Sequence, residues 1–169
     1  MERVTIRRAT ASDARALVAH LRALAGEPEI NVPLALDEVV SVDDERARLE
    51  TFDDHPRAIV LVAERVTDLL GELTLRAISP LRAVAHIAAL GMSVRADARR
   101  QGVGRALLDA ALEWAPTAGL TRIELYVYAR NLPAIALYEK AGFQHEGRRR
   151  NFIREGDVFL DDLVMAKLL

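Results

Sequence analysis

The segment from Arg99 to Ala106 constrains the fold of this chain more than any other, because it places two glycines between two different apolar patterns. An apolar run typical of strands, residues 87–94, precedes it, and an Ala/Leu-rich helical run, residues 106–115, follows it. Glycines at a helix start let a ligand approach backbone amides that have no partner within the helix. The helix dipole and the side chains of Arg99, Arg100 and Arg105 add positive charge there. The segment therefore predicts a strand–loop–helix unit that binds a phosphate-bearing ligand.

Composition narrows the class of protein. Because the chain has 169 residues, 51% hydrophobic and 28% charged, we expect one globular domain spanning residues 1–169. A formal net charge of −2 argues against nucleic-acid binding, and no apolar run is long enough to cross a membrane. The absence of cysteine excludes disulfides, thiolate metal ligands and a cysteine nucleophile, and it is compatible with a cytoplasmic location. Residues 1–4 lack a signal-peptide pattern, and the histidines lack the spacing of metal ligands.

The remaining patterns alternate between strands and helices and predict a mixed α/β fold. We expect strands at residues 4–7, 58–64, 69–77, 85–94 and 122–128, then a closing hairpin of residues 143–152 and 158–168. We expect helices after the capping box Thr10–Asp13, from about Ser41 to Asp53, over residues 106–115 and from Pro133 to Gly142. Residues 26–41 lack periodicity and contain two prolines, so we interpret them as a long loop.

Other phosphate-binding motifs fit the glycine segment poorly. A Walker loop requires a lysine after its second glycine, whereas Arg105 follows Gly104 and neither Ser nor Thr comes next. A dinucleotide-binding fingerprint requires a third glycine or alanine where Leu107 stands. Such a fingerprint also follows its strand directly, whereas here residues 95–101 separate the strand from Gly102. A glycine-rich turn without any ligand is the purely structural alternative.

Two further blocks accompany the glycine segment in a fixed order. The strand before it ends in Leu90-Gly91-Met92-Ser93-Val94, and the loop itself reads Arg99-x-x-Gly102-x-Gly104. The helix after the next strand reads Asn131-x-x-Ala134-Ile135-x-Leu137-Tyr138-x-Lys140-x-Gly142-Phe143. Together these blocks resemble the GNAT superfamily of N-acetyltransferases, and the clear match runs from about Ala85 to Phe152.

The resemblance implies a splayed central sheet and acetyl-CoA as co-substrate. It implies that backbone amides of the glycine segment hold the pyrophosphate and that the strand before it pairs with the pantetheine arm. Asn131 would contact the pantetheine amides or cap its helix, and the N–H near Val94 would stabilise the oxyanion. The expected coenzyme-binding residues are Met92, Ser93, Val94, Arg99, Arg100, Gln101, Gly102, Val103, Gly104, Arg105, Ala106, Asn131 and Tyr138.

The catalytic roles follow from acyl transfer to an amine, which needs a proton acceptor and a protonated leaving thiolate. Without cysteine, direct attack in a ternary complex is the natural mechanism. The resemblance implies that Tyr138 is the general acid, and its structural alternative is an aromatic packing residue. For the general base we rank Glu72 and His86 slightly above Glu124, although each of them alone also fits an ordinary strand residue.

The acceptor site is expected in the loop of residues 26–41, whose acidic residues favour a cationic amine: Glu27, Glu29, Asp37 and Glu38. The block from Gly147 to Met165 resembles family members that act on small molecules such as amino acids. Alternatives are acetylation of a protein N-terminus and a non-catalytic acyl-CoA sensor.

The C-terminal part of the sequence contains one basic and one apolar pattern. The basic run Arg148–Arg150 with Arg154 is either a solvated surface, with Asp161 and Asp162 as partners, or a site for a coenzyme phosphate or an acidic acceptor group. The apolar strand from Val158 to Met165 offers a surface for a homodimer, an assembly common in the family.

Overall fold

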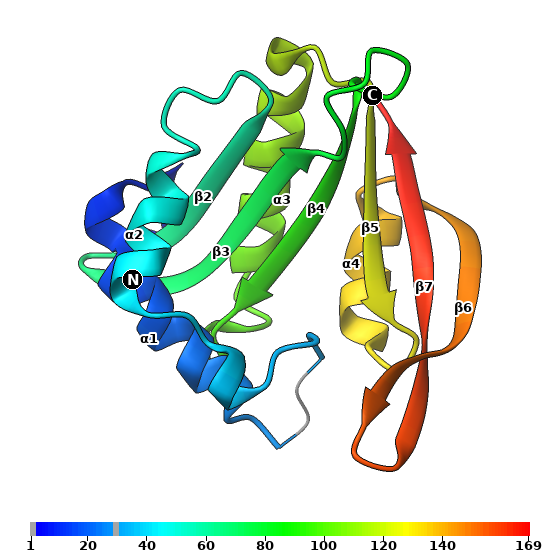
Figure 1. Cartoon of the computed structure of the whole chain (residues 1–169), viewed down its shortest axis with the longest axis horizontal. Coiled ribbons are helices and arrows are strands. Elements are labelled where there is room, and N and C mark those ends of the chain that lie inside the picture. The colour runs from blue at the N-terminus through cyan, green and yellow to red at the C-terminus, as the bar shows by residue number, and fades with distance from the viewer. Residues whose placement is uncertain (1–2, 29–30) are drawn as a thin grey trace.

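A seven-stranded mixed sheet forms the centre of the molecule, in the order β1-β2-β3-β4-β5-β7-β6 (Figure 1). The computed structural model describes residues 3–28 and 31–169. All neighbouring strands are antiparallel except β4 and β5, which run parallel. The strands are β1 (Thr5–Arg8), β2 (Ala58–Arg65), β3 (Asp68–Ala77), β4 (Ile87–Val94), β5 (Arg122–Tyr128), β6 (Gln144–Glu155) and β7 (Val158–Leu168).

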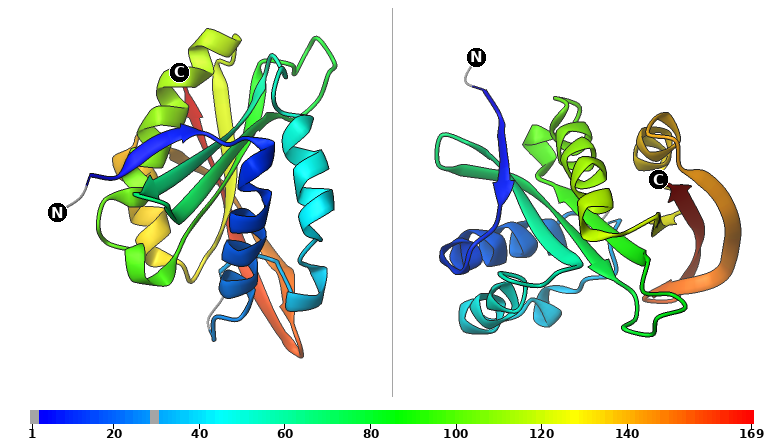
Figure 2. Two further views of the ribbon diagram at one scale, coloured as in Figure 1. Left: turned by 90° about the vertical axis from the view of Figure 1, so that its left-hand side faces the viewer. Right: turned by 90° about the horizontal axis from the view of Figure 1, so that it is seen from above.

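Helices cover both faces of this sheet, although unevenly. Helices α1 (Ala14–Ala25) and α2 (Val42–Glu50) lie on one face, over β2 to β4 (Figure 2). Helices α3 (Val103–Trp114) and α4 (Leu132–Lys140) lie on the opposite face. The face of β5, β7 and β6 on the side of α1 and α2 carries no helix among the described residues. The predicted mixed α/β class is confirmed.

The alternation of side chains along β2 shows how the sheet separates two cores. Ile59, Leu61 and Ala63 join the larger core with the buried residues of α3 and β5. Ala58, Val60 and Val62 join the smaller core, which also contains buried side chains of α1 and α2. Because both faces of β2 are buried from Ala58 to Ala63, its sequence is continuously apolar over these residues rather than alternating.

The sequence signals for helix ends are mostly confirmed. Thr10 and Asp13 form the expected capping box, in which the Thr10 amide donates to Asp13 Oδ2 at 2.8 Å. The side chain of Ser41 caps α2, and Gly142 follows α4 with a left-handed φ of 90°. The predicted start of α3 is wrong, because the helix begins at Val103 rather than Ala106 and includes the second glycine of the loop.

Candidate active site

Strands β4 and β5 separate at one end, which opens the sheet (Figure 1). Their parallel register runs only from the pair Ile87 and Arg122 to the pair Leu90 and Leu125. Residues 91–94 of β4 stay paired with β3, whereas residues 126–128 of β5 pair with β7. The facing edges of β4 and β5 therefore carry backbone groups without a strand partner, as expected for a splayed sheet.

The ladder between β3 and β4 determines which backbone groups of β4 face this gap. Arg95, just after β4, donates its amide to the carbonyl of Leu70 at 2.8 Å. Bonded and non-bonded pairs alternate in an antiparallel ladder, so Met92 and Val94 direct their N–H and C=O groups away from β3. The backbone of Ser93 faces β3 instead. Of the three residues expected to pair with the pantetheine arm, only Met92 and Val94 present their backbone to the gap.

The loop before α3 presents unbonded amides. Arg100 and Gly102 adopt left-handed conformations, with φ of 63° and 86°, and Gly102 is the N-cap of α3. The first helical hydrogen bond joins the amide of Ala106 to the carbonyl of Gly102 at 3.0 Å. Among the described residues, the amides from Arg100 to Arg105 have no backbone acceptor. These amides fit a diphosphate at the positive end of the helix dipole, whereas the amide of Ala106 is already bonded.

Gly104 brings these amides close to the gap between β4 and β5. A Cβ atom added to Gly104 would lie 3.3 Å from Leu137 Cδ2, and 3.6 Å from side-chain atoms of both Met92 and Val94. The absence of a side chain therefore lets the first turn of α3 approach α4 and the end of β4.

Two arginines of the loop are held within the chain. Arg99 donates from Nε to the carbonyl of Val94 at 2.9 Å, and its Nη2 lies 2.6 and 2.7 Å from the carboxylate oxygens of Glu27. Arg105 pairs with Asp109 one turn along α3, at 2.8 Å. Arg99 thus connects the end of β4, the glycine loop and the segment after α1.

Tyr138 lies on α4, within the larger core. The residue is 6% exposed, and its ring centroid lies 5.7 Å from that of Phe143. Burial raises the pKa of Tyr138 to about 12, so the phenol is protonated at neutral pH, as a general acid requires. Asn131 caps the same helix, because its Oδ1 accepts a hydrogen bond from the amide of Ala134 at 3.3 Å.

A polar cluster lies on the side of β3 and β4 that α1 covers. Glu72 of β3 is the register partner of Ser93 of β4, so their side chains are neighbours on one face. His20 of α1 is 5% exposed, and its Nε2 lies 2.7 Å from Ser93 Oγ. His20 Nδ1 and Glu72 Oε2 are buried and have no hydrogen-bond partner within residues 3–28 and 31–169. Buried polar atoms without a partner cost free energy, so these two atoms mark a polar site that the packing of the chain alone does not explain.

Burial also sets the protonation of this cluster. Desolvation raises the pKa of Glu72, and the nearby Arg48 opposes this shift while Glu45 reinforces it. Desolvation and the charge of Arg95 lower the pKa of His20 to about 4. At neutral pH the imidazole is therefore neutral, and the Glu72 carboxyl binds a proton more readily than an ordinary glutamate. That property suits a general base.

The other two base candidates lie elsewhere. His86 is exposed and precedes the paired end of β4, five positions before the gap begins at Gly91, which corresponds to about 16 Å of extended strand. This distance separates His86 from the gap. Glu124 accepts a hydrogen bond from Tyr126 Oη at 3.2 Å on the face without a helix. Only Glu72 belongs to the polar cluster beside β4.

No role was predicted for His20, because the histidines other than His86 were considered only as metal ligands. Its spacing contains a usable signal, because Leu17, His20 and Leu24 follow one another at three and four residues along α1. All three are buried. A histidine within the apolar stripe of a helix needs a buried polar partner, and Ser93 is that partner.

Acidic side chains of the loop also form bonds within the chain. Glu27 pairs with Arg99, and Glu38 accepts a hydrogen bond from the amide of Ala35 at 2.8 Å. Glu29 lies outside the described residues. Because Arg99 neutralises Glu27, this carboxylate adds little negative charge that could attract a cationic acceptor.

The described ranges, residues 3–28 and 31–169, contain no group of three or more His, Asp or Glu residues that could hold a metal ion. None of their helices is both long and apolar enough to cross a membrane.

An open strand edge, unbonded amides suited to a diphosphate and a protonated phenol define a class of transferases that take the acyl group of a coenzyme A thioester. The family model described as "Acetyltransferase (GNAT) family" matches residues 15–143. The chain belongs to this family, and acetyl-CoA is the acetyl donor that its members use.

Individual relatives agree with this assignment. The chain is 32% identical over 120 residues to the L-amino acid N-acetyltransferase AaaT of Escherichia coli K12, covering 70% of this chain and 74% of that protein. It is 40% identical over 75 residues to the [ribosomal protein bS18]-alanine N-acetyltransferase of the same strain, covering 44% and 51%. A crystal structure of a GNAT acetyltransferase from Streptococcus pneumoniae superposes with a TM-score of 0.93, at 30% identity and with 99% and 100% coverage.

Proposed function

We propose that this chain transfers the acetyl group of acetyl-CoA to the primary amine of a small molecule, such as an amino acid or a polyamine. The amine attacks directly, in a complex of enzyme and both substrates. The observation that carries this proposal is the gap between β4 and β5, flanked by the unbonded amides of the loop before α3. The 32% identity to an L-amino acid N-acetyltransferase supports the small-molecule acceptor.

The backbone of the chain would bind and orient the donor. Acetyl-CoA supplies an activated acetyl thioester on a long arm that carries a diphosphate. The amides from Arg100 to Arg105 would bind the diphosphate, and Met92 and Val94 would pair with the arm as a neighbouring strand does. The N–H of Val94 would donate to the carbonyl oxygen of the thioester, where negative charge develops.

Two side chains would move the protons. Glu72 would accept the proton of the attacking amine through water, because its carboxyl lies in the polar cluster beside β4 and has a raised pKa. Tyr138 would donate its phenolic proton to the sulfur as the carbon–sulfur bond breaks. The new bond joins the amine nitrogen to the acetyl carbon, and free coenzyme A leaves as a thiol.

Acetylation of a protein N-terminus is the alternative, favoured by the 40% identity over 75 residues to the bS18-alanine acetyltransferase. That match covers only about half of the relative's length, 51%. A match over half of the relative supports the shared family more than a shared acceptor.

Location and assembly belong to the same proposal. A cytoplasmic enzyme is consistent with a chain that contains no cysteine and so needs no disulfide. A homodimer would use the exposed start of β7, where Val158 and Phe159 lie on the surface. The later part of the strand contributes less, because Met165 is fully buried in the larger core.

The experiment is a transfer assay with the purified chain. Acetyl-CoA consumption and product mass are measured with a panel of amino acids, polyamines and peptides with free N-termini. We expect acetylated product with small amines. Preferred acetylation of peptides would support the protein N-terminus instead, and tight coenzyme binding without transfer to any amine would support a sensor.

A further inference from the structure

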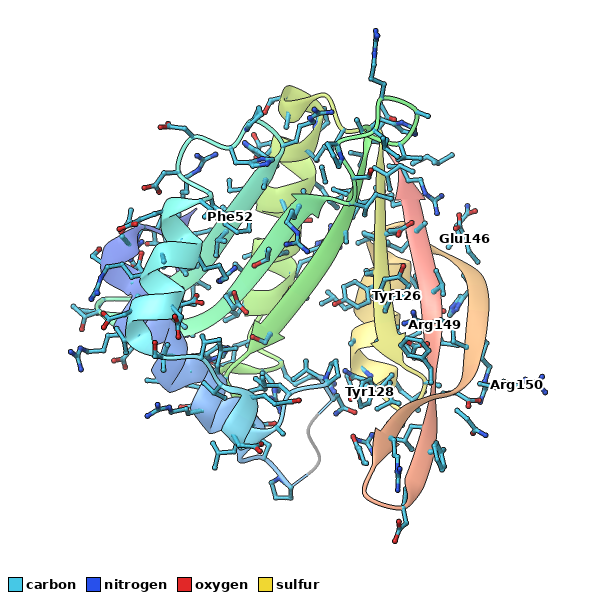
Figure 3. All side chains as sticks on the ribbon, in the orientation of Figure 1. Phe52, Tyr126, Tyr128, Glu146, Arg149 and Arg150 are labelled. Carbon is cyan, nitrogen blue, oxygen red and sulfur yellow. The ribbon has the colours of Figure 1, made fainter. Side chains whose placement is uncertain are left out.

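An arginine held between aromatic side chains lies on the face of β5, β7 and β6 that carries no helix. Arg149 of β6 reaches across β7 toward Tyr126 of β5, and Figure 3 shows the two side chains together beside β5. The guanidinium carbon of Arg149 lies 4.0 Å from the ring centroid of Tyr126 and 3.5 Å from that of Phe152. Both rings are otherwise exposed, with 50% and 57% of their residue surface accessible. Exposed aromatic rings on both sides of one charged group are typical of a binding surface.

A buried carboxylate fixes the orientation of this guanidinium. Arg149 donates from Nε to Asp162 Oδ1 at 2.8 Å and from Nη2 to Asp162 Oδ2. Asp162 is 2% exposed, so the ion pair lies against the surface of the sheet. Because Asp162 occupies the edge formed by Nε and Nη2, the edge formed by Nη1 and Nη2 points away from it. Nη1 has no acceptor within the described part of the chain. That outer edge has the geometry that binds a carboxylate through two hydrogen bonds.

A β-bulge positions Phe152 over the arginine. The register of β6 and β7 jumps from the pair Arg149 and Asp162 to the pair Ile153 and Leu160, so residues 150–152 oppose Asp161 alone. Asn151 sits in this bulge with a left-handed φ of 52°, and its amide donates to Asp161 Oδ1 at 2.8 Å. Bulges redirect side chains, and this one places the Phe152 ring against Arg149.

The stack lies beside the gap in the sheet. Leu125 is the last residue of β5 that pairs with β4, and Tyr126 is the next residue. Tyr126 also alternates with Leu125, which belongs to the larger core, so its side chain lies on the face opposite α3. A molecule bound on that face would approach the gap from the side opposite the diphosphate-binding loop.

We propose that Arg149 binds the carboxylate of the acceptor, so that the acceptor is a free amino acid rather than a polyamine or a protein N-terminus. This inference rests on the proposed function and specifies its substrate class. A polyamine has no carboxylate, and a protein N-terminus has none beside its amine. Tyr126 and Phe152 form apolar walls on either side of the bound carboxylate, and Asp162 is a positioning residue that keeps the outer edge of Arg149 free.

The test compares amino acids with their C-terminal amides, which differ only in the charge and acceptor capacity of one group. With the wild-type chain and acetyl-CoA, we expect kcat/KM to be at least about tenfold higher for the free acid. In Arg149→Lys the ammonium still neutralises Asp162 but lacks the outer edge, so the preference for the acid should fall about tenfold while the KM for acetyl-CoA stays unchanged.

Arg148→Lys is the matched control, because Arg148 is the preceding residue and pairs with Asp161 at 2.6 Å. This variant should keep the preference for the acid. Equal kcat/KM for acids and amides in the wild type would overturn the inference without affecting the proposed acetyl transfer, and so would an unchanged preference in folded Arg149→Lys. If no amine is acetylated, the proposed function fails. The inference is then decided by thermal shift, where the free amino acid, but not its amide, should stabilise the wild type.

Discussion

His20 Nε2 and Ser93 Oγ lie 2.7 Å apart, and this contact joins α1 to the end of β4 that borders the open gap. The backbone of Ser93 is bonded toward β3, and its neighbours Met92 and Val94 face the gap. The hydrogen bond therefore holds the strand whose backbone would receive the donor. The contact uses the side chain of Ser93, so it does not occupy the gap-facing backbone of Met92 or the N–H of Val94, whose carbonyl accepts a hydrogen bond from Arg99 Nε.

We predict that His20 and Ser93 are energetically coupled. Ser93→Ala removes the hydrogen-bond partner of a buried imidazole, which should cost about 1–3 kcal/mol of unfolding free energy. In the double variant His20→Leu/Ser93→Ala neither partner of this hydrogen bond remains, so its cost should be smaller than the sum of the single variants. Urea unfolding measures all three. As a control, the effects of Thr67→Ala, at an exposed position, and His20→Leu on the unfolding free energy should be additive. Additive effects of Ser93→Ala and His20→Leu would contradict the coupling.

The pH dependence of stability should carry the signature of His20. Its pKa falls from 6.5 to about 4 in the folded chain because of burial and Arg95. Between these values the unfolded chain binds the proton and the folded chain does not. Stability therefore decreases as the pH drops from about 6.5 to about 4, by up to about 1.4 kcal/mol per pH unit. His20→Leu should flatten the curve of unfolding free energy in this window only. Parallel curves for both proteins would show that His20 titrates normally.

Gly102→Val should separate coenzyme binding from stability. A β-branched residue at a φ of 86° costs about 1–2 kcal/mol, and it would also disturb the amides that begin α3. We expect the KM for acetyl-CoA to rise at least about tenfold. Gly119→Val is the matched control, because Gly119 has a φ of 71°, open space around its added Cβ and a place after the far end of α3. It should lose similar stability without the change in KM, and equal effects on KM would contradict the role of the loop.

The local patterns of the sequence predicted most of the fold because each depends on residues close together. Residues 122–128 form β5 as expected, since apolar and polar residues alternate there. The start of α3 was not predictable in this way. Val103 and Gly104 belong to its first turn, although glycine and β-branched residues favour helices weakly. The packing of Gly104 against Leu137 and β4 holds that turn in place.

The residues of the candidate site were predictable only where they belong to a recognisable sequence motif. The glycines at the helix start predicted a phosphate-binding loop, and the family resemblance implied the role of Tyr138, whereas the contacts that organise the site join distant segments. Arg99 pairs with Glu27, 72 residues away, and His20 contacts Ser93, 73 residues away. The helix spacing of His20 indicates that this histidine needs a buried polar partner, but a single sequence does not identify Ser93 as that partner or Glu27 as the partner of Arg99.

Tyr138→Phe should lower kcat by about 100-fold with little change in the KM for acetyl-CoA, because it removes one acidic proton and keeps the ring. The packing against Phe143 is preserved, so the melting temperature should stay within a few degrees of the wild type. Steady-state kinetics and a thermal melt measure both effects. Unchanged kcat would leave Tyr138 as a packing residue only.

Glu72→Gln should make the protein more stable and less active at once. Burial raises the pKa of Glu72 above its ordinary value of 4.5, so the unfolded chain loses the proton first as the pH rises. The carboxyl therefore favours the folded state at low pH and lowers stability progressively above pH 4.5, until its own raised pKa is passed. Glutamine removes this penalty at neutral pH while keeping the shape of the side chain. Arg48 stays paired, because Glu45 binds it through two hydrogen bonds of 2.7 and 2.8 Å.

The melting temperature of Glu72→Gln at pH 7 should thus exceed that of the wild type, whereas kcat should fall about 100-fold and the acidic limb of the pH–rate profile should disappear. His86→Gln is the control, since His86 is exposed at the far end of β4 and should change neither quantity. If Glu72→Gln is more stable but its pH–rate profile keeps the acidic limb, burial of Glu72 destabilises the protein and Glu72 is not the general base. Loss of activity without added stability would mean that Glu72 supports the fold through its contacts. Only the opposite changes in stability and turnover, measured on the same protein, identify a buried carboxyl that is retained because the reaction needs it.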